Sequence, residues 1–317
     1  MSPNNNVWAT LFELARVELG FANDRIPAKE EDEEAFANFF RSNAGGFGVH
    51  SHDKQHAMAY LRIYKGGNNQ ITKNIRAVFG PTNVSIWKFD LISNLFSKSS
   101  MSRARTNTTC IVTAIRDPVD HFLSAYNEVM HRRYVYKNGT VAQFEKFVSD
   151  FIGGPVSNQI YRSRMEELEI AHLYSMSGAL WGLKKLKECH GKEAPSLTAY
   201  LPSLHDLNTE FPKMVQRHCT GLPHFDTFAK EAIHESQSDK YNFRASAKMA
   251  WEFEGATSRA LCIIHALDYA CFDSIPIPTL CQSVYADEEF LEKLLRASSN
   301  ETGDNTSNAC DREFPVV

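Results

Sequence analysis

Short apolar segments of β-type composition alternate with segments of helical periodicity between residues 58 and 201 of this 317-residue chain. The predicted strands span residues 58–64, 84–89, 109–115 and 196–201. The third is almost entirely apolar, which is typical of a parallel strand covered on both faces. Strands that alternate with helices predict an α/β fold, in which helices flank a central parallel sheet on both sides.

Apolar residues at helical spacing predict the helices that accompany these strands. An amphipathic helix is expected within residues 1–26, and further helices are expected over 71–79, 140–152, 159–174, 178–190 and 243–267. From Ser298 onward the chain is rich in Ser, Asn, Thr and Asp, so we expect residues 298–317 to be a disordered tail. Residues 1–297 are predicted to form one domain.

The composition limits the partners that the chain can have. Its formal net charge of −4 gives no reason to expect nucleic acid as a partner. No apolar stretch approaches the roughly 20 residues of a membrane-spanning helix, and the first residues do not resemble a secretory signal. The seven cysteines form no CxxC pair and no zinc-type spacing, so no metal site is predicted.

The pairing of the cysteines is open at this level. Cys271 and Cys281 flank a proline-rich segment at 275–278, so a local disulfide between them is one reading, and buried free thiols are the other. Because the number of cysteines is odd, at least one is unpaired or bonded to another chain. Sequons of the form Asn-x-Ser/Thr give weak support for a secretory-pathway lumen. They begin at Asn83, Asn107, Asn138, Asn300 and Asn305.

The first candidate site follows the predicted strand at 58–64. Residues 65–70 read Lys-Gly-Gly-Asn-Asn-Gln and lead directly into the helix expected over 71–79. Glycines allow the backbone to approach a ligand closely, and the N–H groups at a helix start favour a phosphate or sulfate. The lysine precedes the glycines, unlike the Walker order GxxxxGK[ST], so an ordinary strand-to-helix turn is the alternative reading.

The second candidate site follows the predicted strand at 109–115. Asp117 and Pro118 predict a helix start, because Asp caps helices and Pro is tolerated at the first helical position. Arg116 can pair with phosphate oxygens in bidentate fashion, and Ser124, two turns further on, can donate its hydroxyl to the same anion. In the alternative reading, Arg116 pairs with Asp117 or Asp120 and Ser124 only packs.

Both sites resemble motifs of the sulfotransferases that use 3′-phosphoadenosine 5′-phosphosulfate (PAPS). Residues 65–67 resemble the 5′-phosphosulfate loop of that family. Residues 116–126 closely resemble the 3′-phosphate motif of Golgi carbohydrate sulfotransferases. Weaker similarity at 173–177 and 261–272 extends the resemblance over roughly residues 55–285.

The resemblance implies a P-loop-like three-layer fold and a transfer of the sulfuryl group of PAPS to a hydroxyl acceptor, expected to be a carbohydrate. This in-line displacement requires no metal. Lys65 would act as a catalytic residue that neutralises charge on the leaving oxygen. Asn69 and Gln70 stand where the family usually has Thr or Ser. The cofactor contacts that the resemblance implies are Lys65, Gly66, Gly67, Asn68, Asn69, Gln70, Arg116 and Ser124.

Sulfuryl transfer also needs a general base that takes the proton of the acceptor hydroxyl. We predict Asp90 for this role, because it follows the strand at 84–89 at the sheet edge where ligands gather in open α/β sheets. A helix cap is the structural alternative for Asp90. The other candidates for the base are His50, His52, His56 and His121.

Two other functions compete with the sulfotransferase hypothesis. A P-loop-like phosphotransferase would use ATP and magnesium, but the Walker Ser/Thr is missing from residues 65–70. A catalytically inactive sulfotransferase-fold protein would bind a ligand without turnover. The compartment is open as well: the resemblance and the sequons favour the Golgi lumen, with a membrane anchor outside this sequence, whereas the chain as written favours the cytoplasm.

Overall fold

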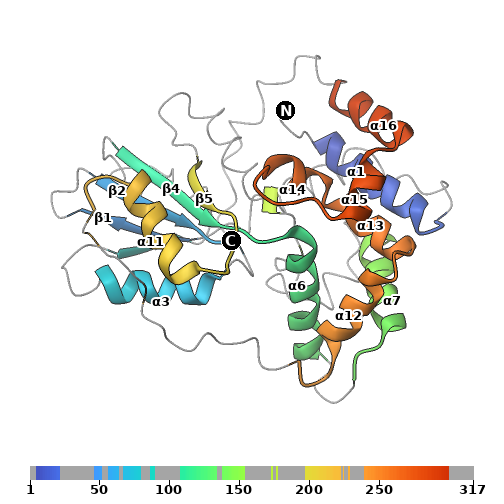
Figure 1. Cartoon of the computed structure of the whole chain (residues 1–317), viewed down its shortest axis with the longest axis horizontal. Coiled ribbons are helices and arrows are strands. Elements are labelled where there is room, and N and C mark those ends of the chain that lie inside the picture. The colour runs from blue at the N-terminus through green and yellow to red at the C-terminus, as the bar shows by residue number, and fades with distance from the viewer. Residues whose placement is uncertain are drawn as a thin grey trace, which may run out of the picture.

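The structure is a computed structural model of the chain. It describes residues 5–21, 46–51, 56–63, 67–79, 86–89, 108–133, 138–153, 173, 176–177, 197–222, 224, 228 and 239–299. In these ranges a mixed β-sheet with two helices occupies one part of the molecule, and a group of helices occupies the other (Figure 1). The chain therefore has an α/β fold, as the sequence predicts. No helix in these ranges is long and apolar enough to cross a membrane.

Five strands form the sheet, in the order β3-β1-β2-β4-β5. They are β1 (Gly46–His50), β2 (His56–Leu61), β3 (Ile86–Phe89), β4 (Thr108–Ala114) and β5 (Leu197–Leu201). β2 pairs in parallel with β4, and β4 pairs in parallel with β5. β1 is antiparallel to both of its neighbours, β2 and β3. Four of the strands thus point the same way.

The prediction of a wholly parallel sheet is wrong at β1. This strand has the sequence Gly-Phe-Gly-Val-His and is not among the predicted strands. Glycine weakens a strand pattern because it has no side chain to pack, so the local signal of β1 is low. Its five residues are nevertheless buried, because the strand lies between β2 and β3.

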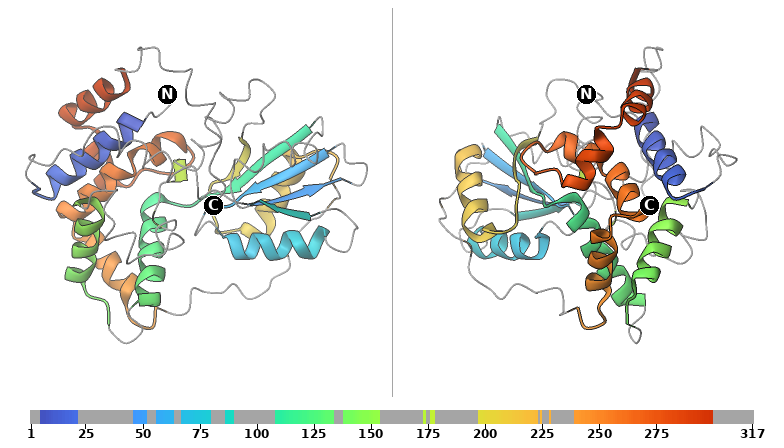
Figure 2. Two further views of the ribbon diagram at one scale, coloured as in Figure 1. Left: turned by 180° about the vertical axis from the view of Figure 1, so that it is seen from behind. Right: turned by 45° about the vertical axis from the view of Figure 1, so that its right-hand side comes forward.

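The described helices are named in chain order, with gaps in the numbering. α3 and α11 accompany the sheet, and the others form the helical part of the molecule (Figure 2). The helices are α1 (Asn5–Glu18), α3 (Asn68–Phe79), α6 (Pro118–Arg133), α7 (Val141–Gly153), α11 (Leu207–His218), α12 (Phe243–Glu252), α13 (Ala256–Ile264), α14 (Ala266–Cys271), α15 (Thr279–Tyr285) and α16 (Glu288–Ser299).

α3 and α11 pack against one face of the sheet. Their apolar side chains join those of β2 and β4 in a common hydrophobic core, with Tyr60 and Phe211 in edge-to-face contact at 5.8 Å. The opposite face carries the small side chains of Ala57 and Ala59, and both are also buried. Both of these helices lie on the same side of the sheet. The described residues therefore establish an α/β fold with helices on one face of the sheet, and the three-layer arrangement stays a prediction.

A second hydrophobic core fills the helical part. The helix predicted after Pro118 is present as α6, and its Phe122, Tyr126 and Val129 are all fully buried. The ring of Tyr126 lies 4.9 Å from that of Phe144 on α7. Ile63 and Ile115, which follow β2 and β4, belong to this same core. The carboxyl ends of these two strands therefore run into the helical part.

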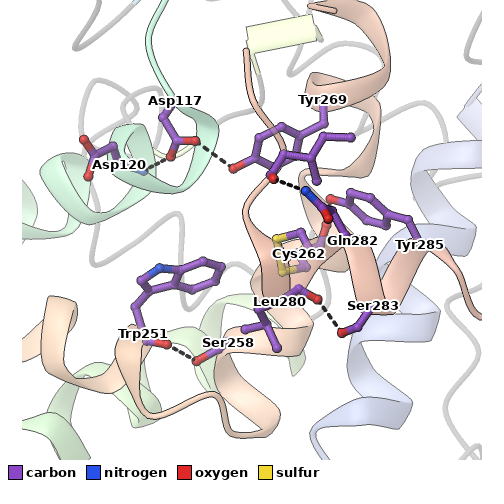
Figure 3. The surroundings of a disulfide bond; sticks show 12 residues. Asp117, Asp120, Trp251, Ser258, Cys262, Tyr269, Leu280, Gln282, Ser283 and Tyr285 are labelled. Carbon is purple, nitrogen blue, oxygen red and sulfur yellow. Dashed lines mark hydrogen bonds between the residues drawn. A yellow bond between two sulfur atoms is a disulfide. The ribbon is translucent and has the colours of Figure 1, made fainter.

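The single helix expected over 243–267 is divided into α12, α13 and part of α14. The break lies at 253–255, where Glu254 has a positive φ of 54° and Gly255 precedes α13. The hydroxyl of Ser258 donates to the carbonyls of Ala250 and Trp251, which lie in the last turn of α12 (Figure 3). A side chain of the second helix thus adds hydrogen bonds to carbonyl groups at the end of the first.

The other predicted elements differ from the structure mainly at their ends. α16 includes Ser298 and Ser299, so the predicted tail begins too early, and residues 300–317 lie outside the described ranges. The helices predicted over 159–174 and 178–190 also lie almost entirely outside them. α11, α15 and α16 are helices that the sequence did not predict. α11 contains Pro212 within a helix, a residue that normally argues against one.

The disulfides link elements that are packed against each other. Cys110 of β4 is bonded to Cys219 at the end of α11, and Cys262 of α13 is bonded to Cys281 of α15 (Figure 3). The local disulfide considered between Cys271 and Cys281 is not formed, and Cys271 is free and exposed. Cys262 and Cys281 are both fully buried, and the helices that contain them pack against each other.

We expect the Cys262–Cys281 disulfide to contribute to stability by restricting the unfolded chain. The bond closes a loop of 19 residues, and loops of this size are worth about 2–4 kcal/mol. A double Cys262→Ala and Cys281→Ala variant should lose that free energy of unfolding, measured by denaturant titration. The matched control, Cys271→Ser, changes an exposed free thiol and should stay within about 0.5 kcal/mol of the parent. Equal stabilities of all three proteins would contradict the assignment.

Candidate functional site

The connections that leave β2 and β4 run in opposite directions across the sheet. The next strand in the sequence after β2 is β3, on one side of the pair, and the next strand after β4 is β5, on the other side. The strand order therefore reverses between β2 and β4. In open α/β sheets, ligands bind outside the carboxyl ends of the strands at such a switch point.

Both candidate phosphate sites follow the two strands at this switch point. The parallel register places Tyr60 opposite Val112, and the hydroxyl of Thr113 donates to the carbonyl of Leu61 at 2.8 Å. Arg116 follows β4 by two residues, and Gly67 begins the described segment after β2. The structure thus places the two turns after neighbouring strands at one sheet edge. Lys65 and Gly66 lie outside the described ranges.

Gly67 forms the entry to α3 in a conformation that favours glycine. Its φ is +72°, and a Cβ atom here would lie 3.0 Å from Leu207 and 3.3 Å from Leu204. Its carbonyl accepts the first hydrogen bond of α3, from the N–H of Ile71 at 3.0 Å. The first turn of α3 contains no acidic residue. The positive end of the helix dipole is therefore not neutralised by its own side chains.

The polar residues of the first turn of α3 have different surroundings. Asn69 is exposed, whereas Gln70 is buried and donates its side-chain amide to the Oδ1 of Asn208 on α11 at 3.1 Å. The side-chain amide of Asn74 donates to the backbone carbonyl of Gln70 at 2.8 Å. Gln70 therefore anchors α3 to α11. Its phosphate contact stays a prediction, as does that of Asn68, whose side chain lies outside the described set.

The predicted start of α6 is confirmed. Asp117 caps the helix, because its Oδ1 accepts from the N–H of Asp120 at 2.8 Å, and Pro118 is the first helical residue. Arg116 and Asp120 form an ion pair at 3.3 Å, with side chains 19% and 54% exposed. One of the alternative pairings is thus present. An ion pair at the surface contributes little, so a doubly charged phosphate is able to replace the Asp120 carboxylate. Ser124 is buried on α6.

Asp117 is held from both sides. Its second carboxylate oxygen, Oδ2, accepts a hydrogen bond from the hydroxyl of Tyr269 on α14 at 2.9 Å (Figure 3). Burial, together with the negative charge of Asp117, raises the pKa of Tyr269 far above its ordinary value, so this phenol stays protonated and donates. Both oxygens of Asp117 are therefore engaged, and the loop containing Arg116 is fixed between the sheet and α14.

The two weaker segments of similarity lie against each other. The N–H of Ser177 donates to Asp268 at 2.7 Å, and the Nδ1 of His265 lies 2.9 Å from the other oxygen of Asp268. Asp268 and His265 are almost completely buried. Asp268 immediately precedes Tyr269, so this buried network supports the residue that holds Asp117. No periodicity in the sequence indicates this role.

The structure separates most of the candidate bases from the switch point. β1 is antiparallel to β2 with His50 opposite Ala57, so His50 and His56 lie at the amino end of β2, at the opposite sheet edge. His121 is buried in the first turn of α6. His52 lies outside the described ranges.

Asp90 is also outside those ranges, and its role as a base stays a prediction. β3, the strand that it follows, is one of the two edge strands of the described sheet and is two strand positions from β2. At the usual spacing between strands this separation is about 10 Å. Among the described residues, no cluster of three or more His, Cys, Asp or Glu side chains is arranged to hold a metal.

Comparisons with known proteins leave the function to be judged from this geometry. No protein-family model, curated protein or solved structure matches the chain. Three features bear on function. They are the switch point, the start of α3, where no acidic side chain of the first turn neutralises the helix dipole, and Arg116 beside the capped start of α6. They suit an elongated anion whose charges lie at two places.

The raised pKa of Tyr269 predicts how stability changes at alkaline pH. The folded protein keeps this proton above pH 10, where the unfolded chain loses it, so stability falls as pH rises. Tyr60 and Tyr285, whose pKa values are also raised by burial, act in the same direction. Tyr269→Phe should make the decline between pH 10 and 11.5 shallower by up to about 1.4 kcal/mol per pH unit. Denaturant titrations at several pH values measure this slope, and an unchanged slope would contradict it.

Proposed function

We propose that this protein is a PAPS-dependent sulfotransferase that transfers a sulfuryl group to a hydroxyl acceptor, most suitably on a carbohydrate. The observation that carries the proposal is the adjacency of β2 and β4. It brings the two turns that resemble the 5′-phosphosulfate loop and the 3′-phosphate motif to one switch point. A nucleotide with phosphates at its 5′ and 3′ positions has charges spaced for two such turns.

In this proposal the protein contributes mainly alignment and charge. Lys65 neutralises the oxygen that leaves with the 5′-phosphate, and the N–H groups at the start of α3 bind that phosphate. Arg116 binds the 3′-phosphate, and Ser124 adds a hydroxyl from α6, the helix that begins two residues after Arg116. The acceptor oxygen attacks sulfur in line with the leaving oxygen, and correct alignment supplies much of the rate increase.

The proposal requires a P-loop-like three-layer fold. In support of it, β2, Gly67 and α3 form a strand–turn–helix unit, and β4 and α6 form a second one beside it. Two features differ from a three-layer fold with a wholly parallel sheet. β1 is antiparallel to its neighbours, and α3 and α11 both lie on one face of the sheet.

The disulfides support a lumenal location. Disulfides persist in oxidising compartments and are rare in the cytosol, and this chain has two of them within its described residues. The Golgi lumen is such a compartment and is also where the carbohydrate sulfotransferases that the chain resembles act. The proposal therefore places the protein there.

A catalytically inactive binding protein of the same fold is a second candidate. The observation that favours it is that Arg116 is paired with Asp120 and Gln70 with Asn208. Binding of the nucleotide without turnover would separate it from the enzyme. The ATP-dependent phosphotransferase has less support, because residues 67–70 offer no Ser or Thr hydroxyl for a magnesium ion.

The proposal predicts opposite effects for the two members of the Arg116–Asp120 pair. Arg116→Ala removes a charged hydrogen-bond donor, worth about 1.5–3 kcal/mol, so the Kd for adenosine 3′,5′-bisphosphate should rise about 10- to 100-fold. Asp120→Asn removes a competing carboxylate, so the Kd should stay equal or fall. Isothermal titration calorimetry measures both. An Arg116→Ala variant with the parent affinity would remove Arg116 from the site.

Nucleotide preference tests the class of enzyme. Adenosine 3′,5′-bisphosphate at about 100 times its Kd should add about 2.7 kcal/mol to the stability of the folded protein and raise Tm by several degrees. ATP with magnesium at the same concentration should raise Tm less, because it has no 3′-phosphate for Arg116. A thermal-shift assay compares the two ligands directly. A larger shift with ATP and magnesium would favour the phosphotransferase instead.

A further inference from the structure

Sulfuryl transfer to a hydroxyl leaves one proton to be accounted for. As the acceptor oxygen bonds to sulfur, the bond between sulfur and the bridging phosphate oxygen breaks, and adenosine 3′,5′-bisphosphate leaves with the electron pair. The proton of the acceptor hydroxyl must pass to a base placed near the sulfuryl group. The identity of that base rests on the proposed function.

The segment after β5 reaches across the switch point. β5 is separated from β2 by β4, yet Leu204 and Leu207 both lie against Gly67, the glycine that follows β2. The bond between Gln70 and Asn208 fixes α3 and α11 to each other at the same place. Residues 202–206 therefore pass the carboxyl end of β4 and end beside the turn that begins α3.

His205 is part of this crossing segment. It lies between Leu204 and Leu207, and its side chain is exposed. Its backbone N–H donates to the hydroxyl of Ser203 at 3.2 Å, which helps to hold the segment in this conformation. Within the described part of the chain, the imidazole makes no side-chain hydrogen bond, so its ring nitrogens are available to a ligand.

Three carboxylates near this edge have structural partners. Asp117 uses both of its oxygens, in the cap of α6 and with Tyr269. Asp120 pairs with Arg116. Asp273, after α14, accepts from the hydroxyl of Tyr200 on β5 at 3.2 Å. None of these three carboxylates is in the segment that lies against Gly67. Asp206 is in that segment beside His205, as the residue that precedes α11, and its carboxylate makes no cap hydrogen bond there.

Among the described histidines, His205 is the one whose position suits the role of general base. His50 and His56 lie at the opposite sheet edge. His218 ends α11, one residue before the disulfide to Cys110, and His224 follows Gly221, which lies against the His56 ring. His131 is 13 residues beyond the start of α6, a distance of about 20 Å along the helix. His121 and His265 are buried.

We propose that His205 is the general base of the reaction. A neutral imidazole nitrogen accepts the proton of the acceptor hydroxyl while the O–S bond forms, and the imidazolium later releases the proton to solvent. Imidazole suits this role because it changes its protonation state readily near neutral pH. The acceptor then lies on the β5 side of the cofactor, between the crossing segment and Arg116.

The test needs no knowledge of the natural acceptor, because water is a slow substitute for it. The measurement is the release of inorganic sulfate from PAPS alone. His205→Gln should lower this rate at least 100-fold, the lower end of what a general base contributes. The Kd for adenosine 3′,5′-bisphosphate should stay within about twofold, since the base does not hold the nucleotide. The matched control is His218→Gln, which changes an exposed histidine at the opposite edge and should leave both values unchanged.

A second measurement locates His205 without any turnover. In an NMR titration with adenosine 3′,5′-bisphosphate, the Cε1–H signal of His205 should move, and that of His218 should not. A His205→Gln variant that releases sulfate at the parent rate, or an imidazole signal that does not respond, overturns the role of His205 alone. A parent protein that does not bind the bisphosphate overturns the proposed function itself. If the parent protein binds the bisphosphate but releases no sulfate from PAPS, both the sulfotransferase activity and the role of His205 as its base are overturned. The catalytically inactive binding protein is then the remaining candidate.

Discussion

The parallel pairing of β2 with β4 is the constraint on which the rest of the structure depends. In this register the two strands end together, so the chain segments that follow them start from neighbouring points at one sheet edge. The divergent connections to β3 and β5 open the space beyond these ends. Without this pairing, Gly67 and Arg116 would belong to separate surfaces, and no shared ligand could be considered.

The helical part of the molecule holds the second turn in place. Asp117 is bound on one side by the first turn of α6 and on the other by Tyr269. The buried contacts of Asp268 with Ser177 and His265 support Tyr269 from behind. Hydrogen bonds between buried polar groups favour one arrangement of the segments that they join. Arg116 is therefore presented from a rigid frame, while its own partner, Asp120, is an exposed and replaceable side chain.

The sheet part holds the first turn through its second helix. α11 is bonded to β4 by a disulfide at one end and to α3 by the Gln70–Asn208 contact at the other. Leu204 and Leu207 close over Gly67 at that second end. The turn after β2 and the segment after β5 thus share one packed boundary. It is at this boundary that a residue distant in sequence, His205, comes close to the predicted site.

The sequence by itself determined the features that depend on neighbouring residues. Apolar runs located β2, β4 and β5, helical spacing located α3 and α7, and the Asp117–Pro118 pair correctly predicted the start of α6. These signals are local, because periodicity and capping involve residues within a turn or two of each other.

Only the tertiary structure decided which of these elements meet. It placed β1 antiparallel inside the sheet, put His50 and His56 at the edge away from the switch point, and paired Cys281 with Cys262. It also brought Tyr269 to Asp117 and the segment of His205 to Gly67. Strand order, strand direction and helix packing arise from contacts between residues far apart in the chain, and no local pattern encodes them.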